Sequence, residues 1–462
     1  MPPSVEPTVI RSPYDGRVLG EVPAHTPADV DAAVARAARA LGEQPLPVWR
    51  RVEILERAAD ALSGRHAEFA TTIADEAAKP IRTARQEVDR AISTIRFSAA
   101  EARRLTGEMV ALDATAQGAD KLGFTMRLPI GVVGAIAPFN FPLNLVAHKL
   151  APAVAAGCPV VLKPAEQTPF SALALADVFQ AAGLPQDYLQ VVTGEGATVG
   201  AAIVDHPAVA FVSFTGSPEV GWQIRSRAPR KRVALELGNN SPLIVEADSD
   251  WAAAAAKTAV AGFSHAGQSC VSTQRVYVHR SVHDAFVEAL VGHVERLVVG
   301  DPLAESTDVS ALISADARDR VVTWIEEASA QGADVRTGGT LTDHGVLRPT
   351  VLTGVRPGMR VSDCEVFGPV VGVAAYDTID AAIELANTTE YGLQAGVFTR
   401  DLGTALRVAR ELDFGGVLVN EVPTWRADQQ PYGGVRESGN TREGPAYTIR
   451  EMTELRMVVL GA

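Results

Sequence analysis

Cys270 is the side chain with the clearest capacity for chemistry in this sequence. It ends the stretch FSHAGQSC (263–270) and is one of only three cysteines among 462 residues. A thiolate is a strong nucleophile, and the small neighbours Gly267 and Ser269 are typical of a loop rather than of a helical face. A lone cysteine is more often a small buried hydrophobe, so the residues alone leave both interpretations open.

Polar side chains follow several short β-rich runs between residues 131 and 237. Asn140 follows GVVGAIA, Lys163 and Glu166 follow PVVL, and Glu236 lies near the end of RVALEL. The carboxyl ends of parallel strands meet at one edge of a sheet, so we expect these side chains to converge on one crevice. Glu236 could pair structurally, or its pKa could be raised enough for a general base. Lys163 and Glu166 could grip ribose hydroxyls or form a solvated loop pair.

The segment TGSPEVG (215–221) has the character of an anion site. Thr215, Gly216 and Ser217 precede a helix that Pro218 opens. Free backbone N–H groups and the positive end of a helix dipole suit a phosphate, although a simple helix cap is the alternative. The sequence contains neither GxGxxG nor GK[ST], so neither the common dinucleotide fingerprint nor a P-loop supports the anion site.

The elements that must position these residues alternate between strand and helix. The first hundred residues are predicted to be helical, with helices at 27–41, 48–62 and 83–105. Beyond them, the apolar runs and their spacing predict strands at 131–137, 159–163, 208–214 and 232–237, with helices at 143–156, 170–182 and 219–227. This alternation predicts a parallel, doubly wound sheet.

A second alternation begins at residue 250 and predicts a second α/β domain. Its expected helices are 250–263, 282–297, 315–331, 379–386 and 401–412, and its expected strands are 273–279, 370–376, 395–399 and 415–420. Residues 111–126 show no helical stripe and are expected to be a boundary or a protruding strand. The terminal strand RMVVL (456–460) is expected to pair either with another subunit or within its own chain.

Composition limits the class of protein. Hydrophobic residues at 47% and charged residues at 21% are ordinary for a globular chain, and the net charge of −13 argues against a nucleic-acid surface. Three cysteines and no apparent signal peptide favour a cytoplasmic protein. The uncharged stretch 128–147 contains three prolines, so we predict a buried strand, a loop and a helix start there rather than a membrane span.

Eight motifs together resemble the NAD(P)-dependent aldehyde dehydrogenase superfamily, in that family's order and approximate spacing. They are PFNFP (138–142), KPAEQTP (163–169), FTGS (214–217), ELG (236–238), GQSC (267–270), EVFGPV (365–370), NTTEYGLQAGVF (387–398) and PYGGVRESG (431–439). The resemblance implies an α/β fold of two doubly wound parallel-sheet domains with a small β arm that joins subunits. The implied boundaries are 1–110 and 131–237 for NAD binding, 238–440 for catalysis, and 111–130 with 441–462 for a homodimer or homotetramer.

The resemblance also assigns roles in oxidising an aldehyde to a carboxylic acid. Cys270 would be the nucleophile, and Asn140 with the Cys270 N–H would hold the oxyanion. Glu236 would activate the water that hydrolyses the thioester. The implied cofactor contacts are Lys163 and Glu166 at the adenosine ribose, Ser217 at the pyrophosphate and Glu365 at the nicotinamide ribose, together with Ala137, Phe139, Thr215, Gly216, Gly238 and Phe367. No metal site is predicted.

Cofactor and substrate preferences rest on few residues. The Glu166 carboxylate would repel a 2′-phosphate, which predicts NAD over NADP. Phe141, Ser269, Val271 and Trp425 are expected to line the substrate site. No arginine adjoins Cys270 or Asn140, which argues against an anionic aldehyde, and Trp425, just before PYGG, favours an apolar or aromatic one. Arg103, Arg104 and Arg426 could still reach the site, so an acidic substrate stays open.

Two other reactions are compatible with a nucleophilic Cys270. The first is transfer of the acyl group to coenzyme A, which Glu236 disfavours because acylating members commonly lack that residue. The second is a cofactor-free thiol hydrolase, which the expected cofactor residues disfavour. Asn239 departs from the commoner ELGG pattern, and Cys158 and Cys364 are expected to be structural.

Overall fold

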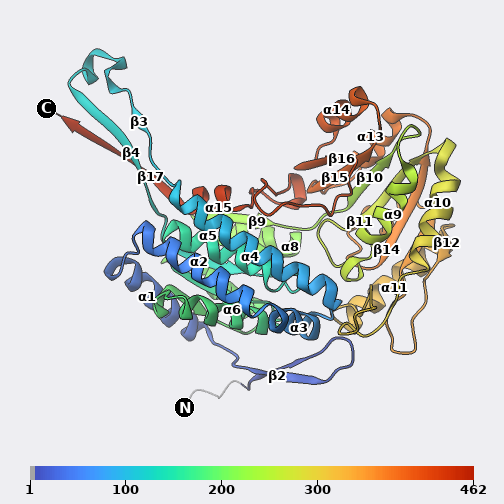
Figure 1. Cartoon of the computed structure of the whole chain (residues 1–462), viewed down its shortest axis with the longest axis horizontal. Helices are drawn as coiled ribbons and strands as arrows, with labels where there is room; N and C mark the ends of the chain where they lie inside the picture. The colour runs from blue at the N-terminus through green and yellow to red at the C-terminus, as the bar shows by residue number, and fades with distance from the viewer. Residues whose placement is uncertain (1–5, 462) are drawn as a thin grey trace.

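The computed structural model describes residues 6–461, which form two large sheets covered by helices, a three-stranded arm and a short hairpin (Figure 1). The hairpin pairs β1 (Thr8–Arg11) with β2 (Val18–Val22). Four helices follow it: α1 (Pro27–Glu43), α2 (Val48–Gly64), α3 (His66–Ala77) and α4 (Ile81–Arg103). The prediction that the first hundred residues are all helical was therefore wrong at the hairpin, and it missed α3.

The first large sheet is five-stranded and parallel throughout. Its order is β7 (Leu189–Val191), β6 (Val160–Lys163), β5 (Val132–Ile136), β8 (Val209–Thr215) and β9 (Arg232–Glu236). The connecting helices are α5 (Asn144–Ala156), α6 (Phe170–Ala181), α7 (Ala201–Asp205) and α8 (Pro218–Arg227). β5 and β6 are buried along their whole length, as continuous apolar strands between two helical layers must be. The predicted doubly wound sheet is confirmed.

Helix α5 forms the centre of the core beneath that sheet. All of its residues are buried, and its apolar side chains pack with those of α2 and α4 in one cluster. This packing fixes the loop between β5 and α5, which carries Asn140.

The second large sheet has seven strands. Its order is β12 (Asp334–Thr337), β13 (Thr350–Thr353), β14 (Val370–Tyr376), β11 (Thr273–His279), β10 (Ser241–Val245), β15 (Gln394–Phe398) and β16 (Gly416–Val419). All neighbours are parallel except β12, which runs antiparallel to β13, and the sequence did not predict β10, β12 or β13. The accompanying helices are α9 (Trp251–Ala261), α10 (Arg280–Val294), α11 (Ala315–Ala330), α12 (Arg360–Asp363), α13 (Ile379–Asn387) and α14 (Leu402–Glu411).

The arm consists of β3 (Met109–Val110), β4 (Lys121–Pro129) and β17 (Thr453–Gly461), and α15 (Pro445–Glu451) leads into β17. It projects away from both large sheets (Figure 1). β17 pairs antiparallel with β4 from Thr453↔Pro129 to Gly461↔Lys121. The terminal strand therefore pairs within its own chain, while its other edge has no paired strand in the described residues.

The uncharged stretch 128–147 folds as expected. It supplies the end of β4, all of β5, the following loop and the start of α5. Within residues 6–461, no helix combines the length and the apolar character needed to cross a membrane.

Candidate active site

A cleft of about 530 Å³ lies where the strands of the five-stranded sheet end. It is also lined by residues that come later in the sequence, among them Cys270 and Glu365, so residues far apart in sequence meet there. Twelve residues proposed from the sequence line it: Ala137, Phe139, Asn140, Lys163, Glu166, Thr215, Gly216, Ser217, Gly238, Cys270, Glu365 and Phe367.

The loop before Cys270 has an unusual backbone. His265 and Ala266 have φ values of 50° and 54°, in the left-handed region that costs energy for residues other than glycine. At Gly267, with φ of 71°, a Cβ would lie 2.1 Å from the Gly368 carbonyl oxygen, so only glycine fits. This strained segment presents Cys270 at the cleft.

Cys270 is partly buried at the edge of the cleft, and its thiol lies against a polar group. Its Sγ is 2.8 Å from the hydroxyl oxygen of Tyr432. Burial raises the pKa of the thiol to about 12. The thiol is therefore protonated at neutral pH, and a base must take its proton before it can attack.

Asn140 lies next to the nucleophile loop. Its Nδ2 donates to the Gln268 carbonyl oxygen at 2.9 Å, two residues before Cys270. A side-chain amide carries two N–H groups, so one remains for another acceptor. The neighbouring Phe139 ring packs edge-on against Phe367 across the cleft, with centroids 5.9 Å apart.

A buried ion pair holds the loop that carries Asn140. Glu87 accepts hydrogen bonds from the backbone N–H groups of Leu143 and Asn144, at 3.0 and 3.1 Å. Lys79 pairs with the same carboxylate and lies 3.8 Å from the centroid of the Phe141 ring. Both charged side chains are almost completely buried.

Glu236 is the last residue of β9, and its side chain is buried. Neither carboxylate oxygen has a hydrogen-bond partner within residues 6–461. A Cβ at Gly433 would lie 2.9 Å from Oε1, so glycine permits the carboxylate to sit there. Burial and the nearby Glu443 raise the pKa of Glu236 well above its usual value, against the opposing effect of Arg426 and Lys149.

A network of buried charges surrounds Glu236. Arg426 lies 3.4 Å from Glu443, and its guanidinium stacks 3.7 Å from the centroid of the Tyr432 ring. The buried Nε of Arg426 has no hydrogen-bond partner in the described part of the chain. Lys149 donates to the hydroxyl of Thr215 at 2.7 Å. Apart from Arg426, which was considered as a possible substrate contact, the members of this network could not be predicted from the sequence, because they meet only through long-range packing.

The cofactor-side residues form a continuous wall. A Cβ at Gly238 would lie 2.5 Å from Oε2 of Glu365, whose other oxygen accepts from the Asn239 N–H at 2.9 Å. Burial raises the pKa of Glu365 to about 7. The asparagine that replaces the second glycine of ELGG thus keeps its backbone N–H directed at Glu365.

The remaining part of that wall is polar. Lys163 lies 3.8 Å from Glu166, which accepts from the Gly196 N–H at 2.7 Å. Ser217 caps α8 by accepting from the Val220 N–H at 3.4 Å. The helix cap considered from the sequence is therefore present, and Ser217 also lines the cleft.

The four residues expected to line the substrate site are not among those lining this cleft. Val271 is buried with Tyr432, and the Phe141 ring packs edge-on against His265 at 6.4 Å. Ser269 is partly buried. Trp425 is 52% exposed and borders a separate hollow beside β16, and its place in the substrate site stays a prediction.

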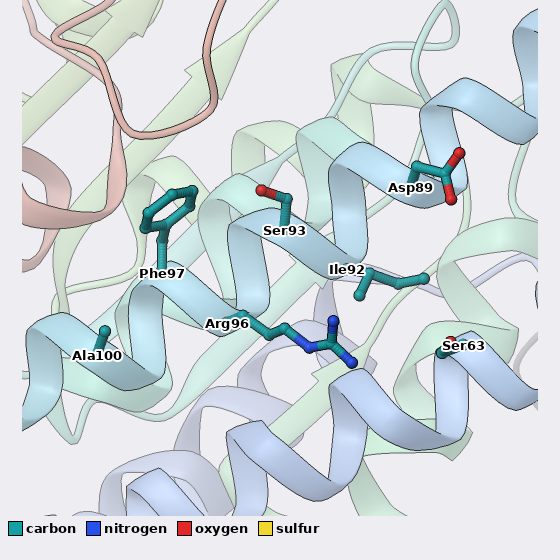
Figure 2. Close-up of a pocket in the computed structure, with 7 residues that line it drawn as sticks. All are labelled: Ser63, Asp89, Ile92, Ser93, Arg96, Phe97 and Ala100. Carbon is teal, nitrogen blue, oxygen red and sulfur yellow. The ribbon is translucent and has the colours of Figure 1, made fainter.

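Two other features carry no chemistry that we can assign. Cys158 is fully buried and donates to the Met452 carbonyl, in agreement with a structural role. A hollow between α2 and α4 (Figure 2) contains Asp89 and Arg96, which pair with His66 and Asp60. No group of three or more His, Cys, Asp or Glu side chains within residues 6–461 is placed to hold a metal ion.

Comparison with known proteins decides the family. The model of the aldehyde dehydrogenase family matches residues 3–458. The chain belongs to that family. Among curated aldehyde dehydrogenases, the 3-sulfolactaldehyde dehydrogenase of Priestia aryabhattai is 47% identical over 447 residues, which cover 97% of this chain and 93% of that protein.

Solved aldehyde dehydrogenase structures share the whole fold. The glyceraldehyde-3-phosphate dehydrogenase of Methanocaldococcus jannaschii, complexed with NADP, matches with a TM-score of 0.95 and 36% identity, over 99% of this chain and 100% of that one. Aldehyde dehydrogenase 21 of Physcomitrella patens, with the reaction product succinate, matches with a TM-score of 0.95 and 36% identity, over 100% and 96%. These findings confirm the predicted family, fold and reaction class, the oxidation of an aldehyde with a nicotinamide cofactor. The choice between NAD and NADP stays a prediction.

Proposed function

We propose that this enzyme oxidises a short anionic aldehyde to the free acid, with Cys270 as nucleophile, Asn140 as oxyanion donor and Glu236 as general base. The observation that carries the assignment is that Cys270 and Asn140 line one cleft with the expected cofactor residues, next to the unpartnered carboxylate of Glu236. The nicotinamide cofactor, when bound, accepts the hydride.

The protonation states support these roles. A thiol with a pKa near 12 needs a base, and Glu236 has a pKa raised by burial toward the range in which a carboxylate takes protons at neutral pH. The thiol proton passes to Glu236 as sulfur attacks the carbonyl carbon. Glu236 then releases that proton to solvent, and its carboxylate removes a proton from the water that attacks the thioester. As the C–S bond breaks, this second proton passes to the Cys270 sulfur, so the acid and the free thiol are formed.

The second N–H of Asn140 donates to the substrate carbonyl oxygen. That oxygen gains negative charge when sulfur attacks the aldehyde and again when water attacks the thioester. Lys79 and Glu87 fix the following residues, so the amide is positioned before the substrate arrives. An oxyanion donor held in place contributes about 2.7 to 4 kcal/mol to transition-state stabilisation.

The cleft residues fit a dinucleotide. Lys163 and Glu166 would hold the adenosine ribose, Ser217 and the N-terminus of α8 the pyrophosphate, and Glu365 the nicotinamide ribose. The Glu166 carboxylate lines the cleft beside Lys163, which supports a preference for NAD because a 2′-phosphate would meet a like charge. In this proposal, residues 1–110 and 131–237 form the cofactor domain and 238–440 the catalytic domain.

Arg426 supports the anionic class of substrate. Its buried guanidinium stacks on the ring whose hydroxyl contacts Cys270, and one of its N–H groups is unsatisfied in the described structure. A buried unsatisfied donor is costly, and an anionic group on the substrate would satisfy it. Sulfolactaldehyde, glyceraldehyde 3-phosphate and succinate, named for the relatives above, all carry an anion a short distance from the reacting carbon. This replaces the expectation of an apolar aldehyde.

We also propose that β17 and β4 join two subunits. Leu455, Met457 and Val459 are 42% to 56% exposed on one face of β17, and the outer edge of that strand is unpaired in the described chain. An exposed apolar edge strand favours pairing with a second copy.

One experiment tests the reaction and the substrate class together. NADH formation and acid product are measured for aldehydes matched in length with and without a terminal carboxylate, with NAD or NADP, and with or without coenzyme A. We expect acid equal to NADH without coenzyme A, faster turnover of the anionic aldehydes, and no turnover by Cys270→Ala. Dependence on coenzyme A would indicate the acylating reaction instead, and acid release without NAD would indicate a thiol hydrolase.

A further inference from the structure

The hydroxyl of Tyr432 lies within hydrogen-bond distance of the Cys270 thiol. Tyr432 is 4% exposed, and its oxygen lies 2.8 Å from the Cys270 Sγ. In the sequence this tyrosine is part of PYGG and gave no sign of a contact with a cysteine 162 positions away.

The fold leaves the Tyr432 ring little freedom. Its backbone N–H donates to the Glu443 carbonyl at 2.8 Å, and Arg426 stacks on one face of the ring at 3.7 Å. Val271 and Leu393 pack with it in a small apolar cluster that also contacts Cys270. The hydroxyl is therefore held in place before any substrate binds.

The next residue along the chain connects Tyr432 to the general base. Gly433 lies so close to Glu236 that a Cβ there would be 2.9 Å from Oε1, and 2.1 Å from the Thr441 carbonyl oxygen. The dipeptide Tyr432-Gly433 thus contacts both the nucleophile and the base, which fixes their relative positions.

The protonation states determine which way the hydrogen bond runs. Burial, with the nearby Cys270, raises the pKa of Tyr432 well above its usual value, so the hydroxyl keeps its proton. While Cys270 is a thiol, either group can donate. Once the thiol has lost its proton, only the tyrosine can donate, and a hydrogen bond to an ionised acceptor is stronger than one between neutral groups.

We propose that Tyr432 is a catalytic residue whose O–H donates to the Cys270 thiolate, stabilising the anion and fixing the direction of the sulfur lone pairs. This rests on the proposed role of Cys270 as nucleophile. The thiol proton goes to Glu236, while Tyr432 keeps its own. The sulfur electron pair forms the new C–S bond, the carbonyl π pair moves to oxygen, and the tyrosine bond weakens because the sulfur is no longer charged.

The charged groups around Cys270 and Tyr432 have opposing effects on the Cys270 thiolate. Glu236 and Glu365 disfavour a thiolate at Cys270, whereas Arg426 and the Tyr432 hydroxyl favour it. Arg426 is in turn paired with Glu443. Removal of the hydroxyl alone leaves those charges in place, so Tyr432→Phe isolates the hydrogen bond. Phenylalanine also keeps the ring surface against which Arg426, Val271 and Leu393 pack.

The test measures the thiolate directly. The rate at which iodoacetamide alkylates Cys270 is followed by peptide mass spectrometry between pH 6 and pH 10, on the full chain, with Cys364→Ser in the background because Cys364 is only partly buried. Tyr432→Phe is compared with the parent protein and with Tyr447→Phe, whose side chain lies at the surface, 37% exposed. Thermal unfolding is recorded for each variant.

We expect Tyr432→Phe to be alkylated roughly tenfold more slowly at neutral pH, since loss of a hydrogen bond to a charged group lowers the thiolate fraction. The rise of the rate with pH should shift upward by about one unit, and kcat/KM should fall by the same factor, while Tyr447→Phe changes neither. An unchanged alkylation profile would overturn the proposal, whether or not kcat/KM falls. If Cys270→Ala still turned over, the nucleophile assignment would fail instead.

Discussion

The ion pair of Lys79 and Glu87 gives the sharpest test of how the fold positions the site. Their side chains are 0% and 1% exposed, and Glu87 also accepts two backbone N–H groups at the start of α5. Glu87→Ala removes the carboxylate, leaves the Lys79 ammonium buried without its partner, and frees the N–H groups of Leu143 and Asn144.

The expected cost follows from those contacts. Removing one partner of a buried ion pair destabilises a protein by about 3 to 5 kcal/mol. The matched control is Glu101→Ala, on the same helix, because Glu101 pairs with the exposed Arg104 and an exposed pair contributes about 0 to 1 kcal/mol. Glu87→Gln keeps an acceptor for the N–H groups, so its cost should lie between the two.

Unfolding in urea, followed by tryptophan fluorescence, measures these differences, and the turnover rate is measured on the same samples. We expect Glu87→Ala to lower both stability and kcat, because the loop that carries Asn140 loses its anchor. The double variant Lys79→Met/Glu87→Gln should be less damaged than Glu87→Ala, since it leaves no buried charge unpaired. Equal stability of Glu87→Ala and Glu101→Ala would refute the reasoning.

Further predictions concern the base, the cofactor, the substrate and the arm. The turnover rate should rise with pH as Glu236 loses its proton, because only the carboxylate can act as a base. Since the pKa of Glu236 is raised, this rise should occur above the pH range in which carboxyl groups usually titrate, and Glu236→Gln should lack it. Glu166→Ser should increase the NADP to NAD efficiency ratio roughly tenfold or more, and equal use of both cofactors by the parent enzyme would contradict the stated cause. Arg426→Gln should lower kcat/KM for a carboxylate-bearing aldehyde by roughly 10-fold or more beyond its effect on a neutral aldehyde of equal length, because loss of the charge near Cys270 lowers both; Arg426→Lys should lie closer to the parent. Met457→Asp should give a smaller species in light scattering, while an unchanged mass would argue against a subunit contact through β17.

The strands that carry the site could be predicted because their sequence signal is local. β5, β6, β8 and β9 are short apolar runs, and parallel strands that end at one edge must bring their following loops together. The hairpin β1–β2 was missed because its strands are short and each has only one buried residue, Ile10 or Val22, so no continuous apolar run marks them.

The interior of the site could not be predicted in the same way. Tyr432 contacts Cys270, Glu87 anchors the segment after Asn140, and Arg426 pairs with Glu443, and each contact depends on how separate elements pack. Trp425 was proposed from its position next to PYGG, and it borders a hollow separate from the cleft, so its role at the substrate mouth stays a prediction. The sequence motifs identified many of the residues that line the cleft, but not the side chains behind them that hold those residues in place.

The most direct test of the central claim is a single-turnover measurement on Glu236→Gln. The variant is mixed with NAD and an anionic aldehyde, NADH is followed in the first turnover, and Cys270 is then analysed by peptide mass spectrometry. Because the amide cannot take the thiol proton, we predict that NADH forms more slowly than in the parent and stops at one per active site, with an acyl adduct on Cys270 that is released more slowly still. Continued turnover at the parent rate, or NADH formation that leaves no adduct on Cys270, would contradict the account.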